Sequence, residues 1–149
     1  MGKTGLKFSP VKGEKTKHWT SEVINFCDSM NGKSFIWNER DCFSLICSVV
    51  DVMFKTDYYN EQLKHKRGAR SSIKFFRQDE ILKSLQEIGY MESEKKSAQA
   101  GDVYYEKDED GRENTAINLY DCVMMANEKD GIFIVKKNFL SKSVKVMTI

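Results

Sequence analysis

Residues 42–54 of the sequence, CFSLICSVVDVMF, form an apolar run of about three helical turns. Its apolar side chains fall on nearly every side of such a helix: Cys42, Phe43, Leu45, Ile46, Val49, Val50, Met53 and Phe54. A helix that is apolar all round is stable in water only when other elements cover it. The run therefore predicts a central, buried helix, which Asp41 or Asn38 can cap at its start.

Two other segments show helical spacing. Apolar residues recur from Trp19 to Met30, and the Asn-Gly-Lys at 31–33 ends this pattern, so we expect a helix capped by Thr20 or Ser21. Residues 55–72 are polar and basic, and predict a loop with at most a short helix. Residues 73–90 predict a third helix, which Gly89 ends. Its apolar face consists of Ile81, Leu82, Leu85 and Ile88.

The hydrophobic period changes after residue 99. Short runs of β-branched and aromatic residues follow, separated by the turn sequences Glu-Asp-Gly and Lys-Asp-Gly, which indicates antiparallel strands over 100–149. Helices first and strands after predict an α+β fold with N-terminal helices packed on a C-terminal antiparallel sheet. The length of 149 residues is typical of one domain, which we place at 18–149. We interpret residues 1–17, which contain five lysines and one glutamate, as a basic arm that becomes ordered on an assembly partner.

Composition excludes several function classes. A net charge of +2 gives no bulk electrostatic reason to expect nucleic-acid binding. No apolar run is long enough to span a membrane, and the N-terminus has no secretory signal pattern. The four cysteines and two histidines lack the spacing of a zinc site, so we expect no metal and no cofactor. Three of the cysteines, Cys27, Cys47 and Cys122, are expected to be reduced and buried.

Cys42 stands where a nucleophilic thiol would. Unpaired backbone N–H groups and the dipole at a helix N-terminus favour a thiolate. A working nucleophile also needs a partner that takes its proton, normally a histidine from another element. The sequence alone leaves two interpretations of Cys42 open, a nucleophile or a small residue at a crowded helix start.

A family resemblance bears on this choice. The stretch FIWNERDC at 35–42, the apolar helix after it, the basic middle section and AGDVYY at 100–105 before a strand meander resemble the NlpC-like group of papain-type cysteine peptidases. These enzymes cut the peptide stems of bacterial peptidoglycan, and the sequence is most similar to their short bacteriophage tail-assembly members. The resemblance extends from Trp19 to Ile149. It implies a papain-like fold, with Cys42 as the nucleophile after Asp41, and Gly101 and Asp102 as the pair that opens the sheet.

The resemblance also implies a histidine base near the start of the second strand, and this histidine is missing. Asn114 or Thr115 occupies the position, and neither side chain accepts a proton near neutral pH. The sequence has histidines only at His18 and His65. We therefore predict a pseudoenzyme that serves as a minor structural or assembly component of a phage tail, with other tail proteins as its partners. The alternative is an active hydrolase of peptidoglycan stems, with Cys42 as nucleophile and His65 as base.

One basic cluster is a candidate docking surface. Lys64, Lys66, Arg67 and Arg70 lie near two tyrosines, a combination that can hold phosphate and stack bases, but a solvated loop or a surface that docks on an acidic partner is the preferred interpretation. A tail component would be found in the host cytoplasm during assembly and afterwards in the virion.

Overall fold

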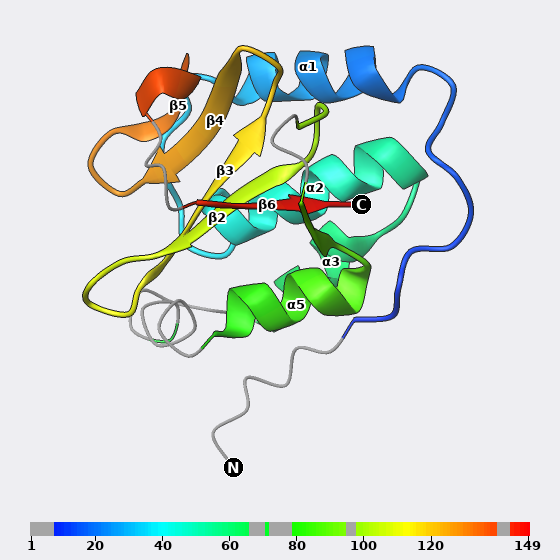
Figure 1. Ribbon diagram of the computed structural model, residues 1–149, viewed down its shortest axis with the longest axis horizontal. Helices are drawn as coiled ribbons and strands as arrows, with labels where there is room; N and C mark the ends of the chain where they lie inside the picture. The colour runs from blue at the N-terminus through cyan, green and yellow to red at the C-terminus, as the bar shows by residue number, and fades with distance from the viewer. Residues whose placement is uncertain (1–7, 66–70, 72–78, 95–97, 140–143) are drawn as a thin grey trace.

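The computed structural model describes residues 8–65, 71, 79–94, 98–139 and 144–149, and it has the α+β arrangement (Figure 1). Its helices are α1 (Trp19–Met30), α2 (Cys42–Phe54), α3 (Tyr58–Leu63) and α5 (Glu80–Ile88). Its strands are β1 (Met91–Ser93), β2 (Val103–Lys107), β3 (Glu113–Asn118), β4 (Cys122–Asn127), β5 (Gly131–Lys136) and β6 (Lys145–Thr148). A short 3₁₀ helix at Lys137–Phe139 follows β5. The helices precede the long strands, as the sequence predicts. None of the described helices is long and apolar enough to cross a membrane.

The six strands form one antiparallel sheet with the order β1-β6-β2-β3-β4-β5. Strands β2 to β5 are the predicted meander. The last strand, β6, returns past the meander and pairs with β2, and the short β1 pairs with its outer edge. The sequence analysis did not predict β1, because Met91–Ser93 is too short to show a period of two residues.

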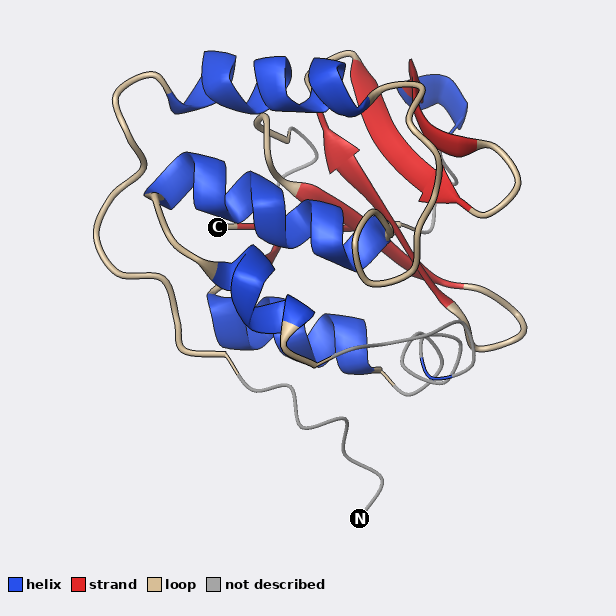
Figure 2. Cartoon of the chain, turned by 180° about the vertical axis from the view of Figure 1, so that it is seen from behind, coloured by secondary structure: helices blue, strands red, loops and turns tan. Residues whose placement is uncertain are grey.

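Helix α2 is the centre of the fold, as its apolar run predicts. It lies between α1 and α5 on one face of the sheet, and α3 packs on its outer side (Figure 2). The α2 residues Phe43, Ile46, Cys47, Val49, Val50 and Met53 are fully buried. At about 25 cal/mol per Å² of apolar surface removed from water, this helix supplies a large part of the driving force for folding.

The predicted cap of α2 is confirmed, and the predicted cap of α1 is wrong. The Asp41 carboxylate accepts a hydrogen bond from Ser44 N at 2.8 Å, and Ser44 Oγ accepts one from Asp41 N at 2.9 Å. This reciprocal capping box fixes Cys42 as the first residue of α2. The N-cap of α1 is His18, whereas Thr20 and Ser21 lie inside the first turn, where Ser21 Oγ donates to His18 O.

The third predicted helix is observed as α5, and its last residue precedes Gly89, which has φ +128°. The part of this prediction over residues 73–78 lies outside the described residues. The first turn of helix α5 is capped by a residue of the sheet, because the side chain of its own N-cap residue, Asp79, makes no capping hydrogen bond. Buried Glu113 of β3 accepts hydrogen bonds from Ile81 N at 3.1 Å and Leu82 N at 2.9 Å. A carboxylate at this position satisfies unpaired N–H groups of the first turn.

The segment before α1 corrects the prediction of a free basic arm over 1–17. Residues 8–17 form no helix or strand, but they pack along the helices. Phe8 is buried against the rings of Phe43 and Tyr58, because its apolar side chain fills the space beside α2 and α3. Val11 N donates to Ile88 O at 2.8 Å and Thr16 N donates to Met53 O at 2.8 Å. Residues 8–17 therefore belong to the domain, and residues 1–7 lie outside the described part.

Candidate functional site

Cys42 lies between the start of α2 and the sheet, beside two adjoining pockets. The inner pocket is mainly apolar and too narrow to hold a water molecule, and is lined by Cys42, Leu45, Thr115, Ile117, Met124, Met125 and Ala126. The outer pocket has a volume of about 110 Å³ and is lined by Phe35, Cys42, Arg112, Glu113, Asn114, Thr115, Met125, Ala126 and Asn127. Cys42, Thr115, Met125 and Ala126 line both pockets, and Cys42 and Thr115 are the two of them that carry a thiol or hydroxyl group.

The structure distinguishes between the two residues predicted at the base position. Successive side chains of a strand point to opposite faces. Ile117 belongs to the core between sheet and helices, whereas Ala116 belongs to the cluster on the other face. Thr115 therefore faces α2 and Cys42. Asn114 is exposed, lines only the outer pocket, and donates from Nδ2 to Asp108 Oδ2 at 3.2 Å within the β2–β3 hairpin.

His65 is not brought to the pockets. It follows α3, whose Gln62 Nε2 donates to Asn38 O at 2.8 Å, so the end of α3 lies beside the segment that leads into α2. His65 lines neither pocket in the described part of the chain.

The other motif residues have structural roles. Gly101 has φ +88°, and a Cβ there would lie 2.6 Å from Met53 Sδ, so this position requires glycine. Asp102 is buried and accepts hydrogen bonds from Gln99 N and Thr148 Oγ1, at 2.8 Å and 2.9 Å, which ties the start of β2 to β6. Asp41 caps α2. Gly101, Asp102 and Asp41 therefore stabilise the fold around Cys42.

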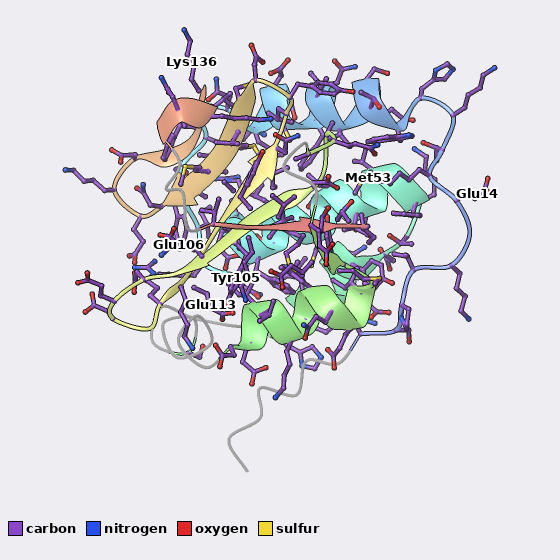
Figure 3. All side chains as sticks on the ribbon, in the orientation of Figure 1. Glu14, Met53, Tyr105, Glu106, Glu113 and Lys136 are labelled. Atoms are coloured by element: carbon purple, nitrogen blue, oxygen red, sulfur yellow. The ribbon has the colours of Figure 1, made fainter. Side chains whose placement is uncertain are left out.

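The acidic group nearest to the outer pocket is directed away from it. Tyr105 Oη donates to Glu113 Oε2 at 2.6 Å, and the two side chains lie together beside α5 (Figure 3). Burial raises the pKa of Glu113, and its hydrogen bonds from Tyr105, Leu82 and Ile81 oppose this effect. With its oxygens occupied by these donors, Glu113 supports the start of α5.

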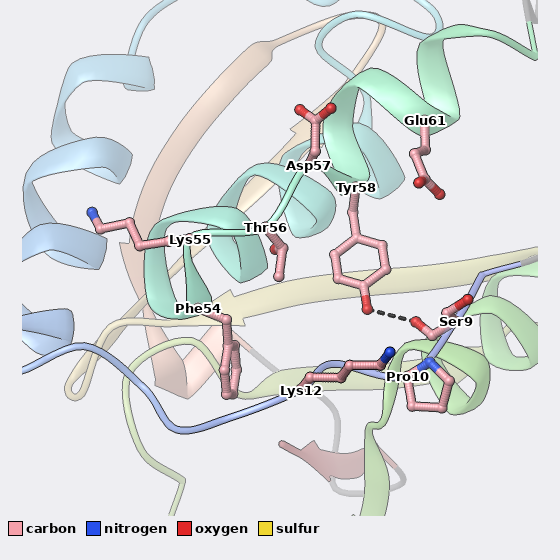
Figure 4. A pocket seen from close by; sticks show the side chains of 9 residues that line it. All are labelled: Ser9, Pro10, Lys12, Phe54, Lys55, Thr56, Asp57, Tyr58 and Glu61. Carbon is pink, nitrogen blue, oxygen red and sulfur yellow. Dashed lines mark hydrogen bonds between the residues drawn. The ribbon is translucent and has the colours of Figure 1, made fainter.

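The remaining predicted site residues contribute little. Lys64 is exposed at the end of α3, while Lys66, Arg67 and Arg70 lie outside the described residues, so the docking surface remains a prediction. In the described part of the chain, no group of three or more His, Cys, Asp or Glu side chains could hold a metal ion. A third pocket, of about 350 Å³, lies between residues 9–12 and the α2–α3 connection (Figure 4). Most of its residues are exposed, and Tyr58 Oη closes one side by donating to Ser9 O.

The sequence analysis did not identify Phe35, Arg112 and Asn127 as part of the site. Phe35 lies between α1 and α2, Arg112 lies between β2 and β3, and Asn127 is the last residue of β4, so only the folded arrangement brings them to Cys42. A single sequence contains no signal that residues so far apart in the chain will line the same pocket. The resemblance did indicate Thr115, as one of two residues at the base position.

Cysteine labelling checks the placement of the thiols. No disulfide joins the four cysteines in the described residues, and Cys122, which was expected to be buried, is only half-buried, like Cys42. Burial raises the pKa of Cys27 to about 12, with a smaller contribution from Asp28. In native protein at pH 8 we expect iodoacetamide to modify Cys42, while Cys27 and Cys47 react only after unfolding in urea. Equal modification of Cys27 in both states, measured by peptide mapping, would contradict this burial.

A second prediction concerns the Thr115 hydroxyl. The residue is 7% exposed, and its hydroxyl oxygen is not among the buried polar atoms that lack a partner in the described residues. Thr115→Val should therefore change the stability by no more than about 0.5 kcal/mol, measured by urea unfolding. Thr148→Val is the matched control, because the Thr148 hydroxyl donates to Asp102, and it should lower the stability by about 1 kcal/mol. Equal losses in both variants would show that the Thr115 hydroxyl has a partner.

Fold and site together define an α+β domain whose buried helix begins at a cysteine that faces a threonine of the sheet. The sequence model of one family, described as a domain of unknown function (DUF6950), matches residues 14–142. Since this match covers most of the chain, the protein belongs to the DUF6950 family. No curated protein and no solved structure matches the chain.

Proposed function

We propose that this protein is a catalytically degenerate NlpC-like domain that acts as a minor structural or assembly component of a bacteriophage tail. One observation carries the proposal. The cysteine at the start of the central helix faces the second strand of the meander at Thr115, the position where the resemblance implies a histidine base. The site thus retains the placement of a nucleophile and lacks the group that would activate it.

The chemistry of the two side chains supports the loss of catalysis. A threonine hydroxyl does not take up a proton near neutral pH, and so cannot act as the general base for Cys42. Loss of one member of a nucleophile–base pair typically lowers the rate by several orders of magnitude. A helix N-terminus favours the thiolate, but it does not supply the proton that the leaving amine needs.

The active hydrolase with His65 as base is the alternative from the sequence. It would require His65, which lines neither pocket in the described part of the chain, to reach Cys42 from the end of α3. The geometry thus favours the degenerate domain, and activity that depends on His65 is an outcome that the experiments below can detect.

Analysis of phage particles tests the proposed role. Tails and tail-assembly intermediates are purified from cells in which the encoding phage is growing, and their proteins are identified by mass spectrometry. The proposal predicts that this chain is enriched with tails or tail intermediates, and equally so for wild type and Cys42→Ala, because the thiol is not needed for assembly. Absence from both fractions, with the chain recovered only as free protein, would contradict the role.

A further inference from the structure

The cavity between residues 9–12 and the α2–α3 connection shares no lining residue with the two pockets beside Cys42 (Figure 4). Its volume is about 350 Å³. Small-molecule sites usually have volumes of about 300–1,000 Å³. The cavity can therefore hold a small ligand, whereas the outer pocket beside Cys42, with about 110 Å³, is too small for one.

Hydrogen bonds fix both walls of this cavity. Tyr58 Oη donates to Ser9 O at 2.5 Å, which joins the segment before α1 to the start of α3. Asp51 Oδ1 accepts hydrogen bonds from Thr56 Oγ1 and from Tyr58 N, both at 2.7 Å. Tyr58 is also buried and packs edge to face on Phe8. A site whose walls are already held in place binds a ligand at a lower entropic cost.

The charged residues of the lining balance one another. They are two lysines and two acidic residues: Lys12, Lys55, Asp57 and Glu61. Two of the four have partners elsewhere. Lys55 Nζ pairs with Glu22 Oε2 of α1 at 2.9 Å, and Figure 4 shows this side chain directed away from Tyr58. Asp57 Oδ1 accepts a hydrogen bond from Asn60 Nδ2 at 2.7 Å.

The other two charges, Lys12 and Glu61, are available to a ligand. Neither has an ion-pair partner within the described residues, and the two do not pair with each other. Figure 4 shows Glu61 near the backbone end of Tyr58 and Lys12 near its hydroxyl end. An anion would gain from Lys12 but be repelled by Glu61, and a cation would meet the reverse. A ligand that carries both charges can pair with both residues.

We propose that this cavity binds a zwitterionic α-amino acid or short peptide with an apolar side chain. The carboxylate of the ligand contacts Lys12, and its ammonium group contacts Glu61. Its side chain packs on half-buried Phe54, which adds an aromatic surface to the lining. This site goes beyond the proposed function, because it involves no residue of the Cys42 pockets.

A series of leucine derivatives tests the need for both charges. Leucine is compared with N-acetyl-leucine, which lacks the ammonium group, and with leucinamide, which lacks the carboxylate, by calorimetric titration of the full chain. We expect leucine to bind at least about tenfold more tightly than either derivative, because each derivative loses one charge-assisted hydrogen bond. Leucyl-leucine is titrated in parallel. Tighter binding of leucine identifies a free amino acid as the ligand, tighter binding of leucyl-leucine identifies a peptide, and either result supports the proposal.

Two variants assign the charges to their residues. Lys12→Gln should weaken the binding of leucine about tenfold and leave leucinamide unaffected, whereas Glu61→Gln should weaken leucine and leave N-acetyl-leucine unaffected. Both side chains are exposed, so both variants should fold, which circular dichroism checks. Lys83→Gln, at an exposed position of α5, is the control and should bind leucine as the wild type does.

Three results would overturn the proposal. The first is that neither leucine nor leucyl-leucine binds at about 10 mM. The second is that the blocked derivatives bind as tightly as leucine. The third is that neither Lys12→Gln nor Glu61→Gln changes the affinity for leucine.

Discussion

Thr115→His is expected to make Cys42 react with iodoacetamide about five to ten times faster at pH 6.5. Position 115 faces Cys42 across both pockets, so an imidazole there can hold the thiolate as an ion pair. Lowering the thiol pKa from about 8.5 to about 6.5 raises the thiolate fraction roughly fiftyfold, and the lower nucleophilicity of that thiolate removes most but not all of the gain. Alkylation of Cys42 is followed by peptide mapping over pH 5–9.

The neighbouring residue provides the control. Asn114 lies one position earlier on β3, and its side chain is hydrogen-bonded to Asp108 in the hairpin. Asn114→His introduces the same imidazole at the rim of the outer pocket, on the other face of the strand, and should raise the rate at Cys42 less than Thr115→His does. Circular dichroism confirms that both variants are folded. Equal rates in the two histidine variants would mean that Thr115 is not the residue opposite the thiol, and would remove the main support for a lost base.

Gly131→Ala is expected to lower the free energy of unfolding by about 3–4 kcal/mol. Gly131 has φ +75°, and a Cβ at this position would lie 2.6 Å from the backbone oxygen of Lys33. That oxygen accepts a hydrogen bond from Ile132 N at 2.9 Å, and Gly32 N donates to Ile132 O at 2.8 Å. A methyl group would push the connection after α1 away from β5. The same connection carries Phe35 to the outer pocket, so the variant should also change labelling at Cys42.

Gly32→Ala separates the clash from backbone strain. Gly32 has φ +87°, but no atom lies within 4 Å of a Cβ built there. This variant should lose only about 1–2 kcal/mol, the cost of a left-handed conformation in a residue with a side chain. Urea unfolding followed by tryptophan fluorescence compares the two variants. A loss in Gly131→Ala that does not exceed the loss in Gly32→Ala would show that β5 and residues 32–33 are less closely packed than described.

The elements that rest on strong local patterns could be predicted from the sequence. The apolar run at 42–54 demanded burial on all sides, and α2 covers these residues, with Asp41, one of the two candidate caps, at its start. The turn residues of the meander, such as Gly131, indicated where β4 ends and β5 begins. In these segments, short-range chemistry and the final fold favour the same structure.

Features that depend on long-range packing could not be predicted. Phe8 lies in a Lys- and Gly-rich segment, and only the space beside Phe43 and Tyr58 makes it part of the core. The pairing of β6 with both β1 and β2 connects segments far apart in the chain. At the site, Cys42 and Thr115 could be proposed from a resemblance, but the partial ladder between β3 and β4, which opens the outer pocket, has no signature in the sequence.

Digestion of purified peptidoglycan tests the central claim, that the Cys42 site lacks catalysis, most directly. Wild type, Cys42→Ala and His65→Ala are incubated with peptidoglycan at high protein concentration, and released fragments are identified by mass spectrometry. The account predicts no stem-peptide cleavage above the level of Cys42→Ala, because Thr115 stands where a base would be needed. Cleavage by the wild type that disappears in Cys42→Ala would contradict it, and a further loss in His65→Ala would identify the missing base.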